Sequence, residues 1–132
     1  MTRRGFLSLA AAPLLLRPDL TEPAELASAI RSGHAPKIIC VAFPVLYRQR
    51  HIQGALFAGA TRDGVEALGK LVAGWSKEEP VVLYCGCCPM DRCPNVRPAL
   101  AEMKRLGFTH VRVLNIPRNF HTDWVSKGYP VD

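Results

Sequence analysis

Short runs of β-branched and other apolar residues alternate along this chain with segments whose apolar residues recur at helical spacing. The runs that predict strands are 37–42, 55–58, 80–84 and 111–114. The segments that predict helices are 22–32, 63–75, 95–106 and 120–127. Residues 18–23 are expected to form a polar joint, and 43–53 a loop with a short helical turn. Strands alternating with helices favour an α/β fold, with a small parallel sheet flanked by helices on both faces.

The length and composition agree with one globular domain. The chain has 132 residues, of which 48% are hydrophobic and 21% charged, so a disordered chain is excluded. The net charge is +6, but Arg3, Arg4 and Arg17 all lie in the first seventeen residues. Of the 17 Lys and Arg, the remaining 14 face 11 acidic residues and leave +3. That excess is small and scattered, so we expect no nucleic-acid partner.

The start of the chain predicts an export signal. Arg3 and Arg4 precede the apolar stretch 6–16, which is too short to span a bilayer. The pair of arginines followed by Gly-Phe-Leu resembles the twin-arginine signal of bacteria. We therefore expect a signal segment at 1–20, a domain at 21–132, and a periplasmic or otherwise exported bacterial protein. It would contact the membrane only through this segment, if the segment is not cleaved.

A cluster of cysteines predicts the reactive site. Four of the five cysteines fall within nine residues: Cys85, Cys87, Cys88 and Cys93. The strand 80–84 leads into Cys85, at the carboxyl edge where open parallel sheets bind ligands. The loop then enters a helix, whose N-terminus favours an anion, and Arg92 adds positive charge. We therefore expect the pKa of Cys85 to be lowered, which would make it a thiolate nucleophile.

Several short segments together resemble a known family. They are Leu83-Tyr84-Cys85, Leu106-Gly107-Phe108, Val111-Arg112-Val113-Leu114, the closing Trp124-Val125-Ser126-Lys127-Gly128-Tyr129-Pro130-Val131, and His51-Ile52-Gln53-Gly54-Ala55, in which Gln53 replaces the proline of the family signature. With these segments, residues 21–132 resemble a rhodanese domain. The cysteine loop is several residues longer than is usual in that family.

The resemblance implies a rhodanese-like fold and a sulfurtransferase, or a carrier of sulfane sulfur, that needs no cofactor. Rhodaneses hold the sulfur as a persulfide on one cysteine, at the start of a loop whose backbone amides surround it. By position, Cys85 corresponds to that catalytic cysteine. The implied partners are a small sulfur donor, such as thiosulfate or a persulfide, and a thiophilic acceptor. The implied sulfur-binding loop comprises Gly86, Cys87, Cys88, Asp91, Arg92 and Cys93.

The extra cysteines leave other functions open. Cys85 to Cys88 has the Cys-x-x-Cys spacing of dithiol redox proteins, for which Cys93 or Cys40 would be the resolving thiol. A non-enzymatic module that binds zinc or copper is the other alternative, with Cys85, Cys87, Cys88 and Cys93 as the ligands. A phosphatase is disfavoured, because its cysteine and arginine enclose five residues, whereas Cys85 and Arg92 enclose six.

The export hypothesis predicts the location of a double variant. Replacing Arg3 and Arg4 with lysine keeps the charge but removes the arginine pair, so the variant is expected to stay in the cytoplasm. Cell fractionation followed by immunoblotting measures this, with the wild-type chain as the control. Export of the double variant at the wild-type level would contradict the twin-arginine assignment.

Overall fold

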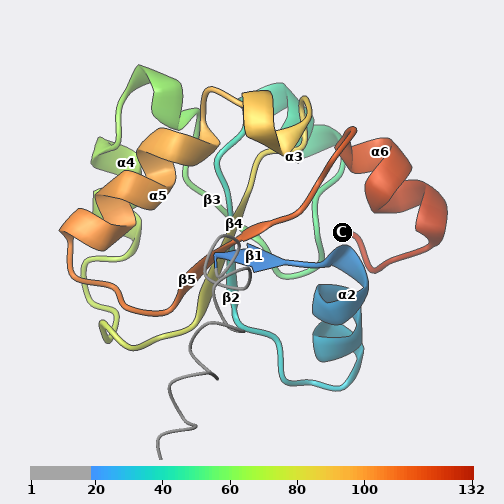
Figure 1. The fold of residues 1–132 in the computed structure, drawn as a ribbon, viewed down its shortest axis with the longest axis horizontal. Coiled ribbons are helices and arrows are strands. Elements are labelled where there is room, and N and C mark those ends of the chain that lie inside the picture. The colour runs from blue at the N-terminus through green and yellow to red at the C-terminus, as the bar shows by residue number, and fades with distance from the viewer. Residues whose placement is uncertain (1–18) are drawn as a thin grey trace, which may run out of the picture.

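The computed structural model describes residues 19–132, so the predicted export signal at Arg3 and Arg4 lies outside the described residues. One five-stranded sheet forms the centre of the fold (Figure 1), in the order β1-β5-β4-β2-β3 with every neighbouring pair parallel. The strands are β1 (Leu20–Thr21), β2 (Lys37–Cys40), β3 (Leu56–Phe57), β4 (Val81–Tyr84) and β5 (Val111–Leu114). The helices are α2 (Pro23–Arg31), α3 (Pro44–Gln49), α4 (Glu66–Leu71), α5 (Val96–Arg105) and α6 (Phe120–Asp123). Three short 3₁₀ helices complete the fold: η1 (Thr61–Asp63), η2 (Met90–Arg92) and η3 (Val125–Lys127).

Helices cover the sheet on both sides. In Figure 1, α4 and α5 lie on one side of the sheet, α2 and α6 lie on the other, and α3 sits above its upper edge. That arrangement confirms the predicted α/β fold. No helix within residues 19–132 is long and apolar enough to cross a membrane.

The first strand lies where the sequence pattern predicts a polar joint, at 18–23. Leu20 pairs with Val113, and Thr21 pairs with Leu114, at the edge of the sheet. Two residues are too few to give an alternating pattern, and only the neighbouring β5 supplies their hydrogen-bond partners. The predicted boundary after residue 20 consequently falls inside β1.

Two predicted helices are shorter than expected. The helix predicted over 63–75 is interrupted at Gly64, whose φ of +147° is outside the helical region, so that η1 and α4 replace it. The helix predicted over 120–127 breaks at Trp124, which divides it into α6 and η3. The Trp124 ring is fully buried, and its indole N–H donates to the Pro130 carbonyl at 2.9 Å. Tertiary packing therefore overrides the helical pattern there.

The segment around Ile52 is attached to both the sheet and the end of the chain. The backbone N–H of Ile52 donates to the Tyr84 hydroxyl at 3.0 Å, and Ile52 forms an antiparallel bridge with Val131. The carbonyl of His51 accepts from the Asp132 N–H at 2.9 Å. Two of the segments that resemble the rhodanese family, far apart in sequence, are thus paired in space.

The central strand β4 predicts a large effect of truncating its leucine. Leu83 is 0% exposed, so Leu83→Ala should lower the free energy of unfolding by about 2–5 kcal/mol, the range for emptying a buried leucine site. Leu56 lies on the edge strand β3 and is 37% exposed, so Leu56→Ala should cost less than about 1 kcal/mol. Chemical denaturation measures both. Equal losses in the two variants would show that β4 does not form the centre of the core.

Candidate functional site

The parallel register brings two cysteine-bearing strand ends together. Cys40, the last residue of β2, pairs with Tyr84, the last residue of β4. Cys85 follows Tyr84 directly, and the loop after it leads through η2 into α5. The sheet therefore fixes the backbone of Cys85 at the carboxyl edge, as the sequence predicts.

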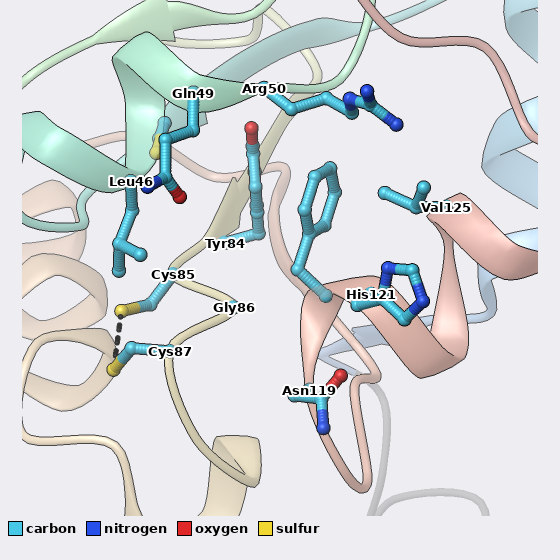
Figure 2. A pocket seen from close by; sticks show the side chains of 12 residues that line it. Leu46, Gln49, Arg50, Tyr84, Cys85, Gly86, Cys87, Asn119, His121 and Val125 are labelled. Carbon is cyan, nitrogen blue, oxygen red and sulfur yellow. Dashed lines mark hydrogen bonds between the residues drawn. The ribbon is translucent and has the colours of Figure 1, made fainter.

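Four thiols form a chain of sulfur contacts in this loop. The Cys85 and Cys87 sulfurs are in hydrogen-bond contact at 3.2 Å, and the Cys87 and Cys88 sulfurs are 3.0 Å apart. The sulfur atoms of Cys85, Cys87 and Cys93 all lie within 4.8 Å of one another. Figure 2 shows the side chains of Cys85 and Cys87 pointing toward each other on the same side of the loop. All five cysteines are free thiols.

Asn95 organises this sulfur cluster. Its amide Nδ2 donates to the Cys85 Sγ, and its backbone N–H donates to the Cys93 Sγ, both at 3.4 Å. The side-chain Oδ1 accepts from the Arg62 N–H at 2.9 Å, and the backbone carbonyl accepts from the Thr61 hydroxyl. Asn95 is fully buried, and every polar group of its side chain has a protein partner. Sequence reasoning missed this residue, because an asparagine before a helix is ordinarily read as an N-cap.

The pKa values of the neighbouring Cys85 and Cys93 thiols shift in opposite directions. The pKa of Cys93 is lowered to about 5, first by a hydrogen bond from the Cys85 thiol, and further by the backbone N–H groups of Asn95 and Val96 at the start of α5. The pKa of Cys85 is raised, first because it is the donor to Cys93 and second because it is buried. The expectation that Cys85 is the thiolate is therefore wrong: Cys93, and not Cys85, lies at the helix N-terminus, where an anion is stabilised.

The thiols of Cys88 and Cys40 remain protonated. Partial burial, together with the contact to Cys87, raises the pKa of Cys88 to about 12. Burial raises the pKa of Cys40 to about 11, and its sulfur lies outside the close group of three. A protonated thiol is a poor nucleophile, so of the two predicted resolving thiols the geometry favours Cys93 over Cys40.

An open pocket of about 740 Å³ lies against Cys85 and Cys87. Figure 2 shows Leu46 and Gln49 on one side of it and Asn119, His121 and Val125 on the other, with the Arg50 side chain extending across the top. The aromatic rings of Tyr84 and Phe120 also line it and are stacked, with their centroids 5.5 Å apart. None of the described residues that line the pocket is acidic, so the pocket suits a neutral or anionic ligand.

The predicted loop residues divide into two groups. Gly86 and Cys87 line the pocket with Cys85, whereas Cys88 and Cys93 contact the other thiols but do not line the pocket. The side chains of Asp91 and Arg92 are exposed on η2 and do not line the pocket. The positive charge expected from Arg92 is therefore absent from the pocket wall, where Arg50, which directly follows α3, lies instead.

Gly86 turns the chain immediately after Cys85. Its φ is +87°, and its carbonyl accepts from the Phe120 N–H at 3.0 Å, which joins the loop to α6. A Cβ added at Gly86 would lie 2.8 Å from the Cβ of Phe120. Both the backbone conformation and the close approach of α6 therefore require glycine here.

This geometry predicts that Gly86→Ala destabilises the protein. The left-handed conformation alone costs a non-glycine residue about 1–2 kcal/mol, and the contact with Phe120 adds to that cost. Gly69→Ala is the matched control, because Gly69 lies in α4 and an added Cβ meets no atom within 4 Å there. Gly69→Ala should leave stability unchanged or raise it by up to about 1 kcal/mol. Chemical denaturation measures both, and a Gly86→Ala variant as stable as wild type would contradict the left-handed turn at this position.

Solved structures with a similar fold include proteins from three bacteria. The crystal structure of the Alr3790 protein from Anabaena sp. has a TM-score of 0.66 at 20% identity and covers 85% of this chain and 90% of that one. Protein hp1203 from Helicobacter pylori has a TM-score of 0.53 at 18% identity and covers 74% of this chain and 77% of that one. A rhodanese from E. coli, solved with anions, has a TM-score of 0.50 at 25% identity and covers 74% of this chain and 98% of that one.

Neither protein-family models nor curated proteins match this sequence. At these identities the structural similarity establishes the fold and leaves the chemistry to the site itself. A domain of Alr3790 is described as rhodanese-like, and the E. coli protein is described as a rhodanese. Residues 19–132 thus have a rhodanese-like fold, with a cluster of cysteines at the carboxyl edge of its sheet.

Proposed function

We propose that this protein accepts sulfane sulfur as a persulfide on Cys85 and passes it to a thiophilic acceptor. The observation that supports this most is the position of the Cys85 sulfur, which lies against the pocket and accepts hydrogen bonds from the Cys87 backbone and the Asn95 side chain. N–H donors aimed at a sulfur atom stabilise the charge that it acquires during transfer.

The proposed reaction is balanced without an oxidant or a reductant. The Cys85 thiol gives its proton to Cys93, to which it is hydrogen bonded, and the resulting sulfur anion attacks the outer sulfur of the donor. A new S–S bond forms on Cys85, while the S–S bond of the donor breaks and releases sulfite or a thiolate. A nucleophilic acceptor then takes the outer sulfur, and Cys85 leaves as the anion.

The pocket supports a small anionic donor such as thiosulfate or a persulfide. Arg50 and His121 both line the pocket, and no acidic side chain among the described lining residues would repel the donor. An exported, periplasmic location remains part of this proposal through the arginine pair at the start of the chain.

Dithiol redox chemistry is the second candidate function. The contacts of 3.2 Å between Cys85 and Cys87, and of 3.0 Å between Cys87 and Cys88, favour it. Such a reaction would need an external two-electron oxidant and would leave a disulfide. Mass spectrometry of the native chain separates the candidates, because a persulfide adds one sulfur atom and a disulfide removes two hydrogen atoms.

Replacing single cysteines tests the proposed carrier. Cys85→Ser is expected to reduce transfer of sulfur from thiosulfate to cyanide by about a thousandfold or more, since the nucleophile is lost. Cys88→Ser is the matched control, because Cys88 lies in the same loop but does not line the pocket, and it should only reduce transfer modestly. Rates are measured by the formation of thiocyanate, and the persulfide is detected by intact mass.

Two results would contradict this assignment. Full transfer by Cys85→Ser with complete loss in Cys93→Ser would make Cys93 the carrier. Absence of both transfer and an added sulfur in the wild-type chain, with thiosulfate and with an organic persulfide as donors, would exclude a sulfur carrier altogether.

A further inference from the structure

The sulfur atoms of three cysteines are arranged as the ligands of a soft metal ion. Those of Cys85, Cys87 and Cys93 lie within 4.8 Å of one another. In a trigonal site with metal–sulfur bonds of about 2.3 Å, the sulfur atoms are about 4 Å apart, so small side-chain rotations suffice. We propose that these three thiolates bind one Cu(I) ion, in a site that shares Cys85 with the proposed persulfide.

The donor set favours Cu(I) over other metals. Thiolates are soft ligands that select Cu(I), zinc or iron–sulfur clusters. A structural zinc site is almost always tetrahedral and needs a fourth ligand. Cys88 contacts Cys87 at 3.0 Å but lies outside the close group of three, and that group contains no histidine or carboxylate. Three thiolates alone therefore match a three-coordinate Cu(I) ion. The metal site that the sequence suggested, with four cysteine ligands and zinc or copper, is thereby reduced to three ligands and one metal.

Hydrogen-bond donors surround these sulfurs and would offset the negative charge of a Cu(I)–thiolate centre. Asn95 donates to Cys85 through its side chain and to Cys93 through its backbone. The backbone N–H of Cys87 donates to Cys85, and that of Val96 donates to Cys93. Such partners orient metal ligands, and their loss typically weakens metal affinity about 10–100-fold.

Buried contacts hold the site in place before any metal binds. Asn95 is fixed by Thr61 and Arg62 of η1, so two of the three ligands are tied to a second segment of the chain. Cys85 is fixed by the end of β4. Because these contacts are already made, binding would cost little ordering of the loop.

Access to the site is from the pocket. Cys85 and Cys87 line the pocket, whereas Cys93 is buried and does not line it, so the ion would enter and leave on the pocket side. The Cys85 sulfur cannot hold both Cu(I) and an outer sulfur atom. Metal binding and persulfide formation are therefore mutually exclusive, although the metal site itself does not depend on sulfur transfer.

The test is an anaerobic titration of the reduced full chain with Cu(I), in competition with a chromophoric Cu(I) chelator. One ion per chain is expected, with three sulfur ligands in the X-ray absorption spectrum of the wild-type protein. Cys85→Ser, Cys87→Ser and Cys93→Ser should each weaken binding by at least about 100-fold, more than the loss of an outer partner. Cys88→Ser and Cys40→Ser, which lie outside the group, should keep the wild-type affinity.

Separate measurements on the wild-type chain distinguish the two proposals. Failure of sulfur transfer from thiosulfate would leave the Cu(I) titration unchanged, and failure to bind Cu(I) would leave the transfer of sulfur unchanged. Circular dichroism establishes that each variant is folded. The X-ray absorption spectrum is measured on the wild-type protein, so the number of sulfur ligands that it gives does not depend on the folding of any variant.

Three results would overturn the copper proposal. An equal loss of affinity in Cys88→Ser would replace the three-ligand site by a four-thiol site. Zn(II) bound more tightly than Cu(I), relative to the matching chelators, would refute the choice of metal. Failure of the wild-type chain to compete for Cu(I), or binding unchanged by every single substitution, would leave no specific site at all.

Discussion

The parallel pairing of β4 between β2 and β5 is the constraint on which the rest of this structure depends. Every residue of β4 is buried, and its hydrogen bonds on both sides are made by neighbouring strands. A strand held in this way cannot shift its register without moving its side chains to the opposite face of the sheet. Its end therefore sets the position of Cys85, and the Tyr84 hydroxyl, which accepts from Ile52, ties the same strand to the segment beside the end of the chain.

A second constraint is the set of hydrogen bonds that hold the cysteine loop after the end of β4. The loop from Cys85 to Cys93 has no ladder to hold it, and its geometry depends on a few anchors. Asn95 connects both ends of the loop to η1, the Gly86 carbonyl binds the Phe120 N–H, and the Met90 N–H donates to the Ile116 carbonyl at 2.8 Å. Anchors of this kind let the loop bring free thiols together in a small volume.

The distribution of charge within the cluster relates sulfur chemistry to metal chemistry. The N–H groups at the start of α5 stabilise a thiolate on Cys93, so the pocket-facing Cys85 keeps its proton until that proton is passed to its neighbour. This arrangement gives the Cys85 proton a neighbouring sulfur to which it can move, and the same sulfurs offer a soft cation three ligands. Both proposals assign Cys85 a central role because it is the member of the Cys85–Cys93 hydrogen bond that faces the pocket.

Local patterns in the sequence were enough to predict the α/β fold and four of the five strands, because buried strands and amphipathic helices leave a periodic pattern in the chain. They also predicted the cysteine loop with Cys85 at its start. The two-residue β1 and the break at Trp124 leave no such pattern. Their hydrogen-bond partners, Val113 and Pro130, come from other segments. The role of Asn95 and the location of the thiolate on Cys93 also depended on tertiary structure. Spacing along the chain does not reveal which backbone amides point at which sulfur, and those contacts determine where a buried charge is stabilised.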